Sequence, residues 1–174
     1  ISKSLFLPAN GMAQLDAATF FEVSEISADS FVSVTTNVAI AGFELVRTSG
    51  GDLLGLNARD GLEQLTQLFF PQVAVLGPWK SELGLVNYSS TPVIATISVF
   101  KPDGTLYAAA DLQNNPVTAI VGSNDSLLAD VETLFGFAGE QTLDGWLLVE
   151  STSASLNGFI SYGLPDTGSV ASVT

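Results

Sequence analysis

The sequence contains no cysteine and no histidine among its 174 residues. Disulfides, thiol nucleophiles, imidazole bases and metal sites built from Cys or His are therefore excluded. Positive charge is scarce as well: 5 Lys and Arg stand against 18 Asp and Glu, which gives a formal net charge of −13 and a pI of about 4.1. Such a charge repels a phosphate backbone, so we expect no nucleic-acid partner.

Long apolar runs are missing, although 47% of the residues are hydrophobic. No stretch approaches the roughly 18 consecutive apolar residues of a transmembrane helix, so we expect no membrane span. The chain begins at Ile1 without the basic and apolar regions of a signal peptide, which is typical of a mature or excised piece. The lack of thiols fits a cytosolic and a bacterial secreted protein alike. The scarcity of Lys favours a secreted or cell-surface location.

Alternating apolar residues predict that most of the chain forms β-strands. Val93–Phe100 (VIATISVF) alternates, Lys101–Gly104 supplies the Pro and Gly of a tight turn, and Thr105–Leu112 is predicted to return as the second strand of a hairpin. A second hairpin is predicted from Asn37–Val46 and Asp52–Asn57, because the residues between them are rich in Gly and Ser.

Another strand and a few helical turns complete the predicted elements. Trp79–Asn87 alternates as a strand whose first residue faces the core. Leu127–Phe135 carries apolar residues at helical spacing, with Ser126 as its predicted N-cap. Leu15–Val23 has a similar character, and Asp60–Glu63 shows an N-cap acid followed by Glu three residues later.

Three segments near the N-terminus match three later segments in the same order. The offset grows from 114 to 115 to 116, as short loop insertions would produce. The matches join Leu15–Phe21 to Ala129–Phe135, Asp29–Thr35 to Asp144–Glu150, and Gly42-Phe43 to Gly158-Phe159.

This duplication leaves two domain arrangements open. Residues 1–174 form a single continuous β-sandwich body, which we favour, or residues 1–61 are a half repeat and residues 62–174 a complete repeat. A half repeat has strands without partners, so a neighbouring chain would have to supply them in a head-to-tail assembly.

Several strings in the second repeat carry a family resemblance. They are Leu68–Val73 (LFFPQV), Gly77–Trp79 (GPW), Leu83–Pro92 (LGLVNYSSTP) and Phe100–Gly104 (FKPDG). Together they resemble an uncharacterised repeat module of secreted and surface proteins of bacteria. The resemblance implies an immunoglobulin-like β-sandwich in an extracellular array. Because the matching residues belong to turns and the core, it implies no catalytic residues.

The string Leu164–Gly168 (LPDTG) matches two catalytic or processing patterns. A sortase signal would need a hydrophobic stretch and a basic tail after it, and only six residues follow. An aspartic protease would need a second Asp-Thr-Gly and the rest of a lobe. Pro, Asp and Gly are also the residues of a hairpin turn, which we favour.

Carboxylates and aromatic residues are the remaining candidates. Four acids, Glu132, Glu140, Asp144 and Glu150, lie close in sequence but are predicted on different elements, so we expect solvated charges and no metal site.

The matched strands predict an inward row through Val32 and Val34, which turns Phe31 and Trp146 towards the other face. These two residues and Tyr88, in a polar turn, are the candidate contacts for a partner or a glycan.

The sequence therefore predicts an all-β fold: a two-layer antiparallel β-sandwich with one or two short helices, internally duplicated. We expect a non-catalytic extracellular structural or adhesive module without a cofactor, which binds a protein partner or associates with itself through strand sharing. The alternative is a carbohydrate-binding module that uses exposed aromatic residues. A third hypothesis is a hydrolase with a carboxylate pair.

Overall fold

The computed structural model describes residues 1–27, 30–47, 53–59, 65–75, 77–108, 112–136, 143–164 and 170–173. The chain divides into two compact parts, residues 1–30 and 31–174. The first part holds helix α1, Ala17–Phe21, where a helix was predicted. The side chain of Asp16 accepts a hydrogen bond of 2.8 Å from the Thr19 N–H, so this short helix begins with a side-chain cap.

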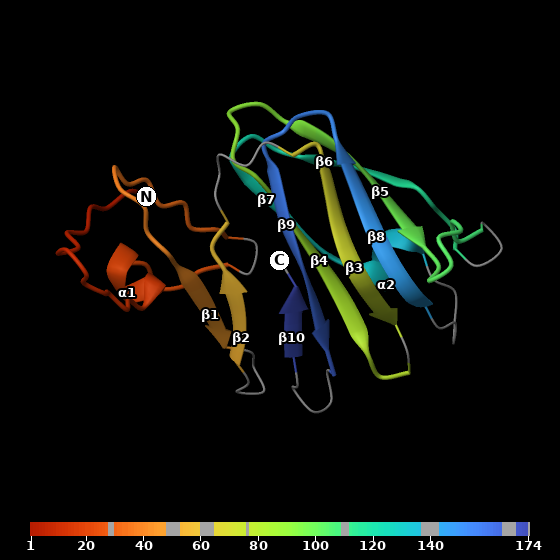
Figure 1. Ribbon diagram of the computed structural model, residues 1–174, viewed down its shortest axis with the longest axis horizontal. Coiled ribbons are helices and arrows are strands. Elements are labelled where there is room, and N and C mark those ends of the chain that lie inside the picture. The colour runs from red at the N-terminus through yellow and green to blue at the C-terminus, as the bar shows by residue number, and fades with distance from the viewer. Residues whose placement is uncertain are drawn as a thin grey trace. The chain divides into compact units, whose positions relative to one another are not determined.

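The second part is a two-layer antiparallel β-sandwich with a separate hairpin (Figure 1). One sheet has the strand order β10-β9-β4-β7, the other β3-β8-β5-β6, and β1 pairs with β2. The fold class predicted from the sequence is therefore confirmed. The elements are β1 Phe43–Arg47, β2 Leu53–Asn57, β3 Gln67–Val75, β4 Lys80–Asn87, β5 Val93–Phe100, β6 Val117–Val121, β7 Asp125–Asp130, α2 Val131–Phe135, β8 Leu143–Ser151, β9 Leu156–Gly163 and β10 Val170–Val173.

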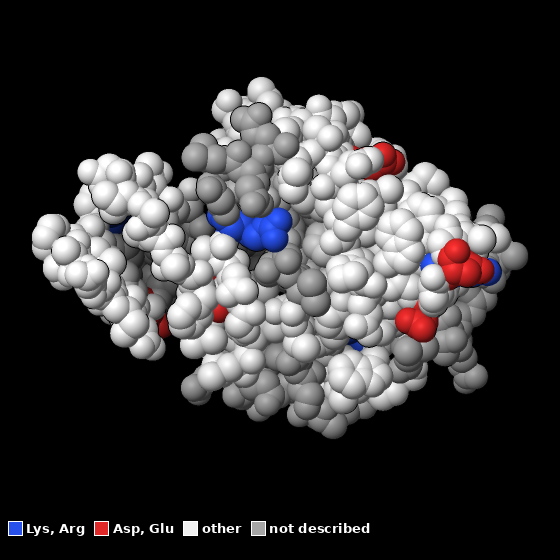
Figure 2. All heavy atoms as spheres, viewed as in Figure 1, with Lys and Arg blue, Asp and Glu red and all other residues white. Residues whose placement is uncertain are grey.

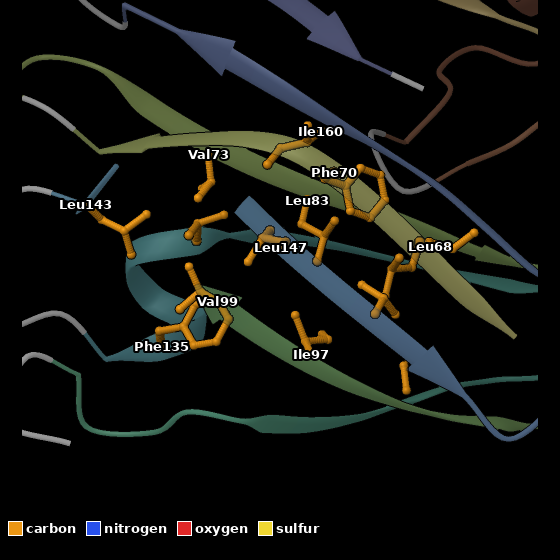
Figure 3. Packing of buried hydrophobic residues seen from close by; sticks show 14 of the residues in the cluster. Leu68, Phe70, Val73, Leu83, Ile97, Val99, Phe135, Leu143, Leu147 and Ile160 are labelled. Carbon is orange, nitrogen blue, oxygen red and sulfur yellow. The ribbon is translucent and has the colours of Figure 1, made fainter. Parts of the chain in front are cut away.

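The core lies between the two sheets and is built by alternation along each strand. Every second residue of β4, β5 and β8 points inward, because side chains of a strand alternate between its faces. Figure 3 shows side chains from both layers, such as Ile160, Leu147 and Ile97, directed towards one another. The fully buried residues include Leu83, Leu85, Val93, Ala95, Val99, Val131, Phe135, Leu143 and Val149.

Most strands pair with partners that are distant in sequence. Only β1–β2, β5–β6 and β9–β10 pair with their successors, whereas β8 lies between β3 and β5 and β4 lies between β9 and β7. The β3–β8 register shifts between Phe70, which pairs with Leu147, and Val73, which pairs with Gly145. A Cβ on Gly145 would lie 1.9 Å from the Phe100 carbonyl oxygen, so close strand packing requires glycine there.

The predicted hairpin of Val93–Phe100 with Thr105–Leu112 is wrong beyond its turn. The turn forms, with the Gly104 N–H donating to the Lys101 carbonyl at 2.9 Å, but only one isolated bridge follows it. The physical reason is the side chain of Asn115, which accepts from the Val99 N–H at 3.1 Å and donates to the Tyr107 carbonyl at 3.0 Å. A continuing hairpin would join these two groups to each other, and the partner of β5 is β6 instead.

The predicted helix Leu127–Phe135 is half wrong. Residues 125–130 form β7, which pairs with β4, and the helix α2 begins only at Val131. Its N-cap is Asp130, which accepts from the Thr133 N–H at 2.9 Å, and Ser126 lies within the strand. The partly buried apolar side chains of this segment can pack on the core whether the backbone is a helix or a strand. The ladder pairing with β4 therefore determines that residues 125–130 form a strand.

Two further strand predictions are tested by the described residues. The hairpin of β1 with β2 is confirmed, although its first strand begins at Phe43 and residues 37–42 of the predicted strand form none, and the strand β4 is confirmed as well. Trp79 was expected in the core but is 39% exposed, because it precedes β4 and lies beyond the inward row. Val32 and Val34 were expected to point inward but are exposed, and residues 30–36 form no strand. The segment Asp60–Glu63 and residues 165–168 of LPDTG lie outside the described residues.

Candidate functional site

An aromatic row crosses the outer face of the β3-β8-β5 layer. It consists of Phe69 from β3, Trp146 from β8 and Phe100 from β5. The outward direction follows from alternation, because the neighbours Phe70 and Leu147 are buried. The sequence prediction that Trp146 points away from the core therefore agrees with the structure, while the role of the row as a contact stays a prediction.

The rings of this row stack on one another. The ring centroids of Trp146 and Phe100 are 4.3 Å apart with planes 10° from parallel, and those of Trp146 and Phe69 are 6.3 Å apart with planes at 30°. Because β3 and β5 flank β8 on opposite sides, the indole has a neighbouring ring on each face. A sugar that stacks on an aromatic residue needs an open face, and in this row Phe69, 62% exposed, has the most open surface.

Polar contacts fix the surroundings of the aromatic row. The Tyr107 hydroxyl donates to the Asp144 carbonyl at 2.8 Å, and the Lys101 ammonium lies 5.2 Å from the centroid of the Tyr107 ring. Gln67 donates to the Glu150 carboxylate at 3.1 Å across the β3–β8 pair. These contacts hold the side chains beside the row in place, which favours a rigid surface.

The structure does not bring Tyr88 to Trp146. Tyr88 is half-buried at the end of β4, and its hydroxyl donates to the Ala154 carbonyl at 2.9 Å in the β8–β9 turn. Trp146 lies near the start of β8, in the other sheet. Phe31 is half-buried and belongs to no strand. The hydroxyl of Tyr88 is thus already used in fastening a turn.

Asn87 is a site that sequence reasoning missed. Its side chain has 0% exposure and connects the segment after β4, the β6–β7 turn and the β8–β9 turn. A polar residue at the end of an apolar strand, followed by Ser and Thr, is the signal that could have identified it. Its amide donates to the carbonyls of Thr91 (2.8 Å), Val121 (3.3 Å) and Gly122 (2.7 Å), and its oxygen accepts from the Ser89 N–H (3.0 Å) and from the hydroxyls of Ser89 (2.9 Å) and Ser155 (3.1 Å).

Two carboxylates face each other across β4 and β7. Glu82 and Asp130 are direct register partners, and Glu132 forms an ion pair with Lys80, each two residues from one of these carboxylates. Partial burial, and secondarily the charge of Asp130, raise the pKa of Glu82. Sequence reasoning had considered Glu132 but not Glu82. Within the described ranges, no group of three or more acidic side chains is arranged to hold a metal ion.

A hollow of about 220 Å³ lies beside the edge strand β3. Its lining includes Arg59, Leu65, Phe69 and Gly158. A glycosidase needs two carboxylates about 5–10 Å apart, and the described residues that line this hollow include none. The hydrolase hypothesis therefore gains no support from this hollow and stays a prediction.

The N-terminal segment, residues 1–57, repeats local features of the sandwich. Helices α1 and α2 share an N-cap Asp, a Thr N–H donor three residues later and a left-handed C-cap, Glu22 in one and Gly136 in the other. Another left-handed residue precedes each helix by the same distance: Asn10 has φ of 56° and Asn124 has φ of 48°. All of these pairs keep the offset of 114 found in the sequence.

The hairpins β1–β2 and β9–β10 match in register as well. Arg47 pairs with Leu53, and their counterparts at offsets 116 and 117, Gly163 and Val170, pair in the same way. The steady drift of the offset thus extends through the last strand. The duplication predicted from the sequence therefore has a structural counterpart at both ends of the N-terminal segment.

The matched apolar positions differ sharply in burial. Residues Leu7, Val32, Val34 and Ile40 are 41%, 52%, 68% and 51% exposed. Their counterparts Val121, Leu147, Val149 and Leu156 are at most 1% exposed. In the N-terminal segment, described apolar side chains are therefore exposed at positions whose counterparts are buried in the sandwich core. This exposed apolar segment, residues 31–45, is the second candidate site.

The visible surface carries few charges. Figure 2 shows that the described atoms of this face are mostly white, with a few small patches of blue and red. Neutral side chains therefore dominate this face, which is compatible with contacts of mixed apolar and polar character.

No helix in the described part of the chain has the length and hydropathy to cross a bilayer. Comparison of the chain with models of known families, with curated proteins and with solved structures finds no match.

Proposed function

We propose that the protein is a non-catalytic structural or adhesive module of an extracellular array, secreted or held at a cell surface, whose units join by sharing strands. The single observation that carries this proposal is the exposure of Val32, Val34 and Ile40, whose counterparts lie in the core. The acidic, thiol-free composition is compatible with an extracellular setting.

Covering these side chains provides the driving force for joining. Full burial of a Val or Ile side chain contributes about 1.5–3 kcal/mol, and each of the three is roughly half exposed. Their burial would therefore contribute about 2–4 kcal/mol, before the ladder hydrogen bonds that a shared strand adds. Among the described residues, β1 also has an edge without a ladder partner, where such a strand can be added.

Sedimentation velocity over a range of protein concentrations tests the proposal. We expect the sedimentation coefficient of the chain to rise with concentration, and Val32→Ser combined with Val34→Ser to remove that rise. The matched control is Ile120→Ser, which removes a 71% exposed side chain from the outer face of β6 and should leave association unchanged. A chain that stays monomeric at every concentration, or a control that abolishes association equally, contradicts the proposal.

A second candidate function, carbohydrate binding, is favoured by one observation: the open face of Phe69 at the end of the aromatic row. Because Trp146 has a ring on each face, Phe69 is the residue available for stacking. Binding to a glycan array that is lost in Phe69→Ala would support this candidate. Binding that is also lost in Trp146→Ala would mean that the whole row is required.

A further inference from the structure

The internal sequence match indicates which strands would cover the exposed apolar segment. At the offset of 114, Ile1 corresponds to Asn115, so the N-terminal segment matches the sandwich from β6 through β10. Nothing in it corresponds to β3, β4 and β5, residues 67–100. In the sandwich, these three strands provide the ladder partners of the others: β4 pairs with β7 and β9, and β5 pairs with β6 and β8.

The elements that form in the N-terminal segment are those that do not need the three missing strands. Helix α1 and the hairpin β1–β2 are formed by hydrogen bonds between residues close in the chain, and both are present. The Ser172 hydroxyl of β10 additionally donates to the Gly55 carbonyl of β2 at 2.8 Å. Residues 1–7, 12–16 and 31–35 correspond to β6, β7 and β8, and none of them is a strand. A strand without a ladder partner has unpaired backbone groups and no stability of its own. Among the described residues of this segment, the elements with local partners form, and the segments whose counterparts pair with β4 or β5 do not.

We propose that residues 31–47 are an acceptor surface for a three-strand segment of the β3–β5 type, supplied by another stretch of repeat polypeptide. This inference rests on the proposed function and identifies the partner in strand sharing. In the sandwich β4 pairs with β9 over eight residues, from Lys80 with Gly163 to Asn87 with Leu156. The equivalent addition places a β4-type strand along residues 40–47 and extends β1 towards its N-terminus.

The incoming strand has a recognisable sequence requirement. The ring of Phe159 lies over Gly84, its register partner, where a Cβ would lie 2.2 Å from the ring. Phe43 corresponds to Phe159 and is 69% exposed. The partner strand therefore needs a glycine opposite Phe43, with apolar residues on either side that match Leu83 and Leu85.

One inward position departs from the pattern. Glu44 corresponds to Ile160, which has 0% exposure in the core. A carboxylate there opposes completion because burial of a charge is costly. Glu44→Ile should therefore strengthen completion, which provides a variant with the opposite direction of effect.

Hydrogen exchange on an extended chain tests the inference. A second copy of residues 65–114 is fused directly before Ile1 of the full chain. The matched control carries the same extension with Asp at its equivalents of Leu83 and Leu85. We expect amide exchange in residues 31–42 to slow about a hundredfold with the first extension, because core strands exchange only through opening of the structure. We expect no change with the control, and a further slowing when Glu44→Ile is added.

The resident strands β4, β5 and β8 report in the same measurement whether the extended chain is folded. If they are unprotected, the extension is attached through a flexible linker of about ten Gly and Ser residues instead, which relieves strain at the junction. Residues 31–42 that exchange as fast as in the parent chain in both forms, or as slowly with the Asp-bearing extension, overturn the inference.

The two proposals fail separately. A parent chain that associates through Val32 and Val34 while the extension leaves residues 31–42 unprotected retains the proposed function but excludes this partner. If the extension protects residues 31–42 but the parent chain does not associate, the identity of the partner strands is retained and the proposed self-association is excluded.

Discussion

Replacement of Asn87 by Ala should be among the most destabilising single changes in the sandwich. The side chain is fully buried and bonds to three separate segments. The hydroxyls of Ser89 and Ser155 have other partners, the Thr91 carbonyl at 2.7 Å and the Ser153 hydroxyl at 3.1 Å, so their loss is partly recovered. The groups that lose a bond without such an alternative are the Ser89 N–H and the Gly122 carbonyl, whereas the Val121 carbonyl belongs to the β5–β6 ladder opposite Val93.

An unmade bond to a buried group costs about 1–3 kcal/mol, and part of the Asn87 network lies near solvent. Two such groups give an expected loss of about 2–4 kcal/mol in the free energy of unfolding. Urea denaturation followed by tryptophan fluorescence measures this loss as a lower midpoint at an unchanged slope. Asn114→Ala is the matched control, because Asn114 is exposed and should change stability by less than about 0.5 kcal/mol.

A second variant separates the two roles of the Asn87 amide. Asn87→Asp keeps the shape and the accepting oxygen but presents a carboxylate to three carbonyl oxygens. Its cost at pH 7 should be at least that of Asn87→Ala. Because burial beside carbonyl oxygens raises the pKa of such an Asp, the cost should shrink as the pH falls from 7 towards about 4, where the neutral carboxyl can donate. An Asn87→Ala variant within about 1 kcal/mol of the parent would refute this account of the network.

Two other predictions concern the core. Gly145→Ala should lower the free energy of unfolding by about 3 kcal/mol or more, because the new Cβ would meet the backbone oxygen of Phe100. The control is Gly55→Ala, whose Cβ has its nearest neighbour at 3.8 Å and which should cost less than about 1 kcal/mol in the same urea assay. Burial raises the pKa of Tyr162 to about 12, above the unfolded value of about 10, so its contribution to stability is complete below about pH 10 and is lost as the pH rises towards 12. Tyr162→Phe should therefore lose less stability than the parent when urea midpoints are compared between about pH 9 and 11, and equal losses would contradict the assignment.

Local features of the fold were predictable from the sequence. The capped helix near Leu15–Val23, the turn at Lys101–Gly104 and the hairpin of β1 with β2 depend on hydrogen bonds between residues close in the chain. Residue preferences predict such hydrogen bonds directly, because a capping acid or a turn glycine acts on backbone groups only a few positions away.

The candidate sites were predictable only in part. The outward direction of Trp146 follows from alternation, but the stacking of Phe69 and Phe100 on its two faces depends on β3 and β5 lying on either side of β8. The role of Asn87 depends on three turns that meet at one point, and no pattern along the chain brings those turns together.

The sequence by itself determined the strand pattern, the duplication and the absence of thiol and imidazole chemistry, because composition and alternation are properties of the chain alone. Only the tertiary structure decided that residues 125–130 form a strand while residues 31–35 do not, although both segments have matched relatives in the other copy. The physical reason is that a strand is stable only beside a ladder partner: β4 provides one for β7, and among the described residues no strand pairs with residues 31–35.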